Sequence, residues 1–91
     1  MEVTVEYNVY QLREITGTQH ETAELAEGST VLQMIEALGA RHGERFRSSV
    51  MLAGSPRPKI MLIVDGKSVI DLEQELKPGS KIHFIQVATS G

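Results

Sequence analysis

The sequence predicts an α+β fold, with one mixed sheet of four or five strands and one main helix packed on one face of it. Alternating apolar residues near both ends of the chain predict strands, and only one stretch has helical spacing over about three turns. One helix can cover one face of a single sheet but not two sheets. With 91 residues, the chain is one domain, predicted over residues 1–87 with a flexible tail at 88–91.

The first strand is predicted to start almost at the first residue, because apolar side chains fall on the odd positions of residues 3–9. Apolar content continues through a less regular stretch at 11–15, and Gly17 suits the turn that follows. A second alternating run contains Ala23 and Leu25. It should pair antiparallel with the first strand across a connection longer than a tight turn.

The main helix is predicted to begin at Thr30, where Gln33 three residues later completes a capping-box pattern. Gly39 or Gly43 can end it. Residues 44–52 predict a second, minor helix or turn. The apolar residues at helical spacing in the main helix are Val31, Leu32, Ile35 and Leu38, with Met34 at the edge of the stripe.

The second half of the chain predicts a loop and three strands. Two prolines within residues 53–59 exclude regular structure there. Residues 60–64 are continuously apolar, which predicts a central strand covered on both faces. The following Asp-Gly pair predicts a hairpin that returns at residues 69–70. A type II turn at 77–80 then leads into the last strand, residues 81–87.

The first and last strands should lie together in the middle of the sheet, because both are long and neither contains proline. This order of elements is the β-grasp, or ubiquitin-like, arrangement. In the last strand, Ile82 and Phe84 should share one face, with His83 and Ile85 on the other.

Composition excludes several classes of function. The net charge is −3 with scattered Lys and Arg, and aromatic residues make up 4%, so no nucleic-acid footprint is present. No apolar run is long enough to span a membrane, and residues 1–6 do not resemble a signal peptide, so a cytoplasmic protein is expected. There is no cysteine.

A search for chemical motifs finds no side-chain active site. His20, His42 and His83 have no metal-ligand spacing and are expected to be exposed, so no metal site is predicted. The unusual feature is the stretch of small residues after the last strand, Ala88, Thr89, Ser90 and Gly91. It is either a frayed end or a slim tail that enters the active site of another protein.

The sequence resembles the small subunit of molybdopterin synthase (the MoaD family) and its relative, the thiazole sulfur carrier (ThiS). The resemblance covers essentially the whole chain. It rests on residues 9–17 with their Leu-Arg-Glu-x-x-Gly segment, residues 28–31, residues 64–67, residues 76–84 and the tail at 88–91. Members of this family end in Gly-Gly, whereas Ser90 occupies the penultimate position here.

The resemblance implies a sulfur carrier in which the carboxylate of Gly91 is the reactive group. A MoeB- or ThiF-type activating enzyme, which uses ATP, adenylates that carboxylate. Sulfur transfer then makes a thiocarboxylate, which serves molybdopterin synthesis inside a MoaE-like large subunit. The carrier itself binds no cofactor. Residues 88–90 would thread the partner's channel, and Phe84 is a candidate partner-binding residue or, alternatively, a core residue.

Two other functions remain open at this point. One is a ubiquitin-like modifier joined to lysines of target proteins through Gly91. The other is a docking-only module that never activates its tail.

Overall fold

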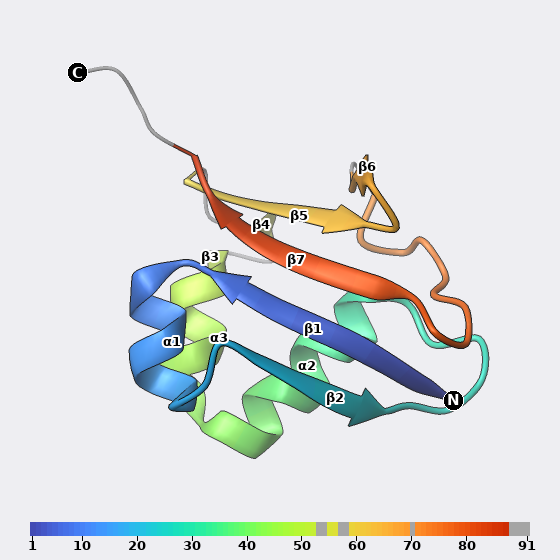
Figure 1. Ribbon diagram of the computed structural model, residues 1–91, viewed down its shortest axis with the longest axis horizontal. Helices are drawn as coiled ribbons and strands as arrows, with labels where there is room; N and C mark the ends of the chain where they lie inside the picture. Colours follow the sequence, from blue (N-terminus) through green and yellow to red (C-terminus); the bar gives the residue numbers. More distant parts are fainter. Residues whose placement is uncertain (53–54, 57–58, 70, 88–91) are drawn as a thin grey trace.

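The computed structural model describes residues 1–52, 55–56, 59–69 and 71–87. Its main sheet has five strands in the order β2-β1-β7-β5-β6. The helices α2 and α3 lie behind this sheet in Figure 1, and the opposite face of the sheet, here called the open face, is turned toward the viewer. The predicted α+β, β-grasp architecture is therefore confirmed.

The two central strands are the first and the last, as predicted. β1 (Glu2–Asn8) runs parallel to β7 (Lys81–Gln86), with Val5 opposite Ile82 and Tyr7 opposite Phe84. β2 (His20–Glu24) pairs antiparallel with β1 along the outer edge. Because β1 and β7 lie near opposite ends of the sequence, their pairing brings the two ends of the domain together in the centre of the sheet.

The main helix begins and ends as the sequence predicts. α2 (Val31–His42) has a complete capping box, since the Thr30 side chain accepts from the Gln33 amide and the Gln33 side chain accepts from the Thr30 amide. It ends at Gly43, whose φ of 99° is in a region that favours glycine. The minor helix is also confirmed, as α3 (Glu44–Val50). Met34, placed at the edge of the stripe, is fully buried.

The stretch predicted to be irregular after the first strand is a helix, α1 (Tyr10–Thr16). β1 ends one residue before Val9, which serves as the helix N-cap. Val9 and Leu12 are buried three residues apart, so the apolar period changes from two to three at this point. Gly17, at a φ of 76°, ends the helix and donates its amide to the carbonyl of Arg13.

The predicted Asp-Gly hairpin joins β5 (Ile60–Val64) to β6 (Lys67–Ser68). Asp65 and Gly66 both have positive φ, 50° and 85°, as a type I′ turn requires. The return strand begins two residues earlier than predicted, and Ile70 lies outside the described residues. β5 is not covered on both faces: Leu62 and Val64 are buried, whereas Met61 is 38% exposed. All of its helical cover is on one side (Figure 1).

The predicted loop at 53–59 contains a short ladder instead of being wholly irregular. β3 (Met51–Leu52) pairs antiparallel with β4 (Ser55–Pro56) in a separate two-stranded sheet. Proline is compatible with a short edge strand, because it need not donate to a neighbour there. The turn at 77–80 is confirmed, with Gly79 at a φ of 80° and the Ser80 amide donating to the Lys77 carbonyl.

Candidate docking surface and tail root

The described residues contain no grouped metal ligands. No three His, Cys, Asp or Glu side chains among them are placed so that they can hold a metal ion. Within the same part of the chain, no helix combines the length and apolar character needed to cross a membrane.

Phe84 belongs to the core and not to a docking surface. Its side chain is fully buried, and its ring lies 5.6 Å from that of Tyr7 and 6.0 Å from that of Phe46. The hypothesis that Phe84 binds a partner is therefore corrected in favour of its alternative. Strand alternation decides this, because Phe84 shares its face with Ile82 beneath the helices.

His42 also differs from expectation, because it is largely buried in an ionic cluster. Its Nε2 lies 2.6 Å from Oε2 of Glu21, and the side chain is 13% exposed. Arg41 donates to the other oxygen of Glu21 over 2.6 Å, and the Tyr7 hydroxyl donates to Oε2 over 2.5 Å. Three side chains, one from β1 and two from α2, thus meet at the carboxylate of Glu21 on β2.

The pKa shifts in this cluster keep Glu21 ionised and Tyr7 protonated. Burial by itself raises the pKa of Glu21, but hydrogen bonds from Tyr7, Arg41 and His42 lower it, and the net shift is downward. Burial, followed by the hydrogen bond to Glu21, raises the pKa of the Tyr7 hydroxyl far above its ordinary value. This cluster fastens α2 to the sheet and exposes no reactive group.

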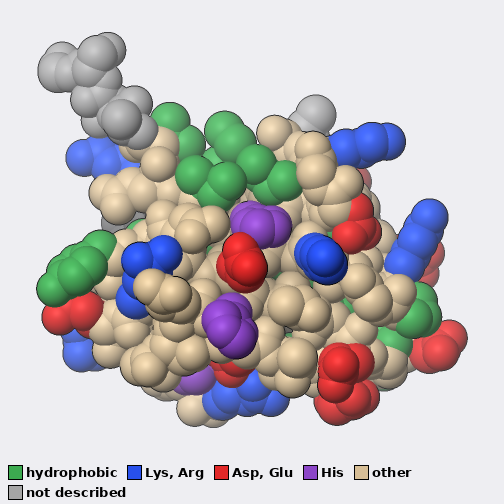
Figure 2. All heavy atoms as spheres, in the orientation of Figure 1, with side chains coloured by type: hydrophobic (Ala, Val, Ile, Leu, Met, Phe, Trp, Pro, Cys, Tyr) green, Lys and Arg blue, Asp and Glu red, His purple; other side chains and the backbone are tan. Residues whose placement is uncertain are grey.

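The open face of the sheet carries an apolar patch formed by β5 and β7. Met61 lies opposite Ile85 in the register of these strands, and Ile63 lies opposite His83. Met61 is exposed, while Ile63 and Ile85 are half-buried. Figure 2 shows hydrophobic side chains gathered on this face. An apolar patch on the strand that leads to the chain's end is suited to docking against another protein.

A row of titratable side chains crosses three strands beside this patch. Glu6 on β1 is in register with His20 on β2 and with His83 on β7. Nδ1 of His83 lies 3.1 Å from Oε2 of Glu6. Figure 2 shows two histidine side chains with an acidic side chain between them on this face. The patch is thus bordered by an imidazole and a carboxylate within hydrogen-bond distance of each other.

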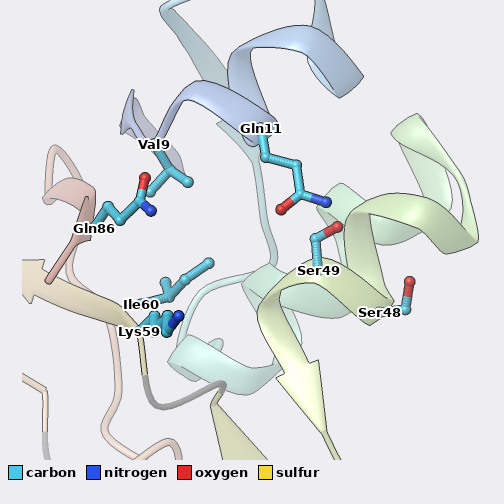
Figure 3. A pocket seen from close by; sticks show the side chains of 7 residues that line it. All are labelled: Val9, Gln11, Ser48, Ser49, Lys59, Ile60 and Gln86. Atoms are coloured by element: carbon cyan, nitrogen blue, oxygen red, sulfur yellow. The ribbon is translucent and has the colours of Figure 1, made fainter. Parts of the chain in front are cut away.

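A pocket of about 600 Å³ lies where β7 ends. The Val87 amide donates to the Lys59 carbonyl over 2.8 Å, which fixes the chain at this point. Figure 3 shows side chains from α1, α3, β5 and β7 around the opening. The lining residues are Val9, Gln11, Ser48, Ser49, Lys59, Ile60 and Gln86.

The tail itself lies outside the described residues. This applies to the predicted reactive residue Gly91, to the predicted channel residues Ala88, Thr89 and Ser90, and to the predicted flexibility of 88–91. The last described residue is Val87, which follows Gln86 of the pocket lining and lies two residues after Ile85 of the apolar patch.

Sequence reasoning missed the open-face residues as a site, although the signal was present. Alternation in the last strand already placed His83 and Ile85 opposite Phe84. The sequence did not reveal the register of the strands. Glu6 and Met61 lie beside these two residues only because β7 pairs with β1 and β5.

Comparison with known families gives one match along nearly the whole chain. The model described as the ThiS family matches residues 5–91, so the match includes Gly91. No curated protein is similar enough in sequence to count as a match.

Several solved structures have the same fold. A Pyrococcus furiosus protein described as subunit 1 of a molybdopterin converting factor is 29% identical, with a TM-score of 0.80 over 97% of this chain and 99% of its own. Haloferax volcanii SAMP1 is 17% identical, with a TM-score of 0.84 over all of both chains. CysO from Amycolatopsis orientalis, solved in a complex with BexX, is 24% identical, with a TM-score of 0.76 over 98% and 99%. The last two likenesses show the fold alone.

Proposed function

Because the chain belongs to the ThiS family and has the ubiquitin-like fold of sulfur carriers, we propose that it carries sulfur as a thiocarboxylate on Gly91 for molybdenum- or tungsten-cofactor synthesis. The observation that carries this proposal is the family match through Gly91, together with a tail of small residues that follows a central strand. The 29% identity to the Pyrococcus furiosus protein favours a molybdopterin precursor over other possible sulfur acceptors.

The chemistry follows from the reactivity of a carboxylate. A free carboxylate is a poor acyl donor, so a MoeB- or ThiF-type enzyme joins Gly91 to the AMP part of ATP and releases pyrophosphate. Hydrosulfide from a sulfur donor then attacks the acyl carbon, the bond from that carbon to the AMP oxygen breaks, and AMP leaves, which gives the thiocarboxylate. The partners supply the catalytic groups, and the carrier supplies positioning through its docked domain. The cycle needs ATP, which fits the expected cytoplasmic location.

The open face and the tail have separate tasks in this proposal. The patch of Met61, Ile63 and Ile85 gives the activating enzyme, and later a MoaE-like large subunit, a surface to bind. Residues 88–90, whose side chains are no larger than threonine, then reach into the partner's channel. In a partner channel that is shaped for Gly-Gly, the Cβ and hydroxyl of Ser90 make binding of the tail less favourable.

The test is intact-mass detection of the thiocarboxylate after incubation with a MoeB-type enzyme, ATP and a sulfur donor. The wild type should gain the mass of sulfur in place of oxygen, and deletion of Gly91 should abolish this product without unfolding the domain. Ser90→Gly should raise the yield about ten- to a hundredfold, since an unsatisfied hydroxyl costs on the order of 1–3 kcal/mol.

Three results would contradict parts of the proposal. Product from the Gly91 deletion would overturn the carrier mechanism, and equal yields from wild type and Ser90→Gly would remove the cost assigned to Ser90. Branched peptides linking Gly91 to lysines, in place of a thiocarboxylate, would instead assign the ubiquitin-like modifier function.

A further inference from the structure

We infer that docking of the activating enzyme on the open face takes up a proton, which is held between His83 and Glu6 in the complex. This inference rests on the proposed function for the existence of the complex, and it adds the charged residues that regulate docking. It concerns a pair that sequence motifs did not single out and that has no part in the tail chemistry.

The geometry of the pair is set by strand register and not by a flexible loop. Glu6 and His83 are partners on the two central strands, β1 and β7, and their side chains lie on the same face. Nδ1 of His83 is 3.1 Å from Oε2 of Glu6, within hydrogen-bond distance. The His83 side chain is 34% exposed and that of Glu6 is 47% exposed. Both are accessible, and both face the side on which a partner would dock.

The pair directly adjoins the apolar patch. Ile63 is the register partner of His83 on β5, and Ile85 follows His83 on the same face of β7. An enzyme that covers Met61, Ile63 and Ile85 therefore also removes water from the His83–Glu6 pair. Because the patch is apolar, we expect the surface of the partner that covers it to be apolar as well.

The other charged groups near the pair do not take the place of a protonated His83 beside Glu6. Lys81 lies two residues before His83 on β7, and Arg13 of α1 donates to Asn8, two residues after Glu6 on β1. β5 presents Met61 and Ile63 to the pair, and β6 presents Ser68 opposite Ile63. The charged or titratable side chains on this face of the described strands are Glu2, Glu6, His20, Glu24, Lys81 and His83.

Burial of the pair changes which protonation state is favoured. A carboxylate covered by an apolar surface is costly unless a positive charge neutralises it at hydrogen-bond distance. A neutral imidazole can donate one hydrogen bond but leaves the negative charge, whereas an imidazolium cancels it. The docked complex therefore favours an imidazolium of His83 beside the carboxylate of Glu6, and docking takes up the proton that this ion pair requires.

The experiment is titration calorimetry of the full chain with the MoeB-type activating enzyme of the same genome, without ATP, in two buffers that differ in ionisation heat. The dependence of the binding heat on the buffer counts protons taken up. For the wild type near pH 7.5 we expect net uptake, and a Kd that falls by up to about tenfold per pH unit as the pH is lowered. Glu6→Gln and His83→Gln should each reduce the uptake and flatten this slope.

His20→Gln is the matched control, because it makes the same substitution in the same row on the other neighbour of Glu6. It should keep the uptake of the wild type. Uptake that persists in both Glu6→Gln and His83→Gln would place the proton on a group of the enzyme and overturn the inference. Wild-type binding without uptake would also overturn it and leave the proposed function standing. No wild-type binding would overturn both.

Discussion

At the scale of single residues, Glu21 shows how one carboxylate holds two layers together. It accepts from Tyr7 on β1 and from Arg41 and His42 at the end of α2, over distances of 2.5–2.6 Å. Its side chain is 14% exposed, so these charged hydrogen bonds are only partly screened by water. They join the sheet to the last turn of the main helix.

Glu21 should make the domain less stable in acid. Its pKa is lower in the folded state than in the unfolded chain, so its contribution is fully present above the unfolded value of about 4.5 and is lost as the pH falls through the lower folded value. Glu21→Gln should reduce the free energy of unfolding by about 1–3 kcal/mol at pH 7. Urea unfolding at pH 7 and at pH 3 measures the difference from wild type, which should shrink at pH 3.

Glu24→Gln is the control for this prediction, since it changes the same strand at a side chain that is 76% exposed. It should alter the free energy of unfolding by less than about 0.5 kcal/mol. A gap between wild type and Glu21→Gln that is the same at both pH values would refute the assigned role of the ionised carboxylate.

At the scale of elements, the start of α2 is set by local sequence and reinforced by distant backbone. The capping box at Thr30 satisfies two amides of the first turn. The Val31 amide donates to the Gln74 carbonyl, and the Leu76 amide donates to the Ser29 carbonyl, so residues 72–76 are tied to the same helix end. The segment that precedes β7 is therefore held against the start of α2 by backbone hydrogen bonds.

Thr30→Ala should therefore destabilise the domain by about 1 kcal/mol, the usual cost of losing an N-cap side chain. Thr30→Ser keeps the accepting oxygen and should restore most of the stability. Thermal unfolding of the three proteins measures this difference, and Tm should fall by several degrees for Thr30→Ala only. Equal Tm values for the alanine and serine variants would show that the capping box contributes nothing.

At the scale of the whole molecule, the two faces of β7 have different roles. Side chains on one face pack in the core, and those on the other face form part of the proposed docking patch. Phe84 packs with Tyr7 and Phe46 under the helices, whereas Ile85 lies on the open face beside Met61. The strand therefore serves the core with one face and the proposed partner with the other. The same strand leads to the tail, so in the proposed function the docking of the open face and the delivery of Gly91 are linked.

Phe84→Ala should lower the free energy of unfolding by about 3–5 kcal/mol, because it empties a core site. Ile85→Ser should cost much less stability but should reduce thiocarboxylate formation by the activating enzyme at limiting carrier concentration. Urea unfolding and intact-mass assays on both variants measure the two effects. Unchanged thiocarboxylate formation in a folded Ile85→Ser protein would exclude this part of the open face from docking.

The sequence alone determined the elements whose signals are local. The capping box at Thr30, the Asp65-Gly66 hairpin and the turn at 77–80 each depend on residues within four positions of one another, and all three are confirmed. Alternation also placed Phe84 and Ile85 on opposite faces. The central position of the first and last strands followed from their length and their lack of proline.

Only the tertiary structure decided the features that depend on register and packing. The helix α1 replaced an irregular stretch because Leu12 has a core to enter, which seven residues of sequence do not reveal. His42 became buried because Glu21 of β2 and the ring of Phe46 on α3 contact it from two other elements. The pairing of Glu6 with His83 required residues 77 positions apart to become neighbours, and only the parallel pairing of β1 with β7 specifies that register.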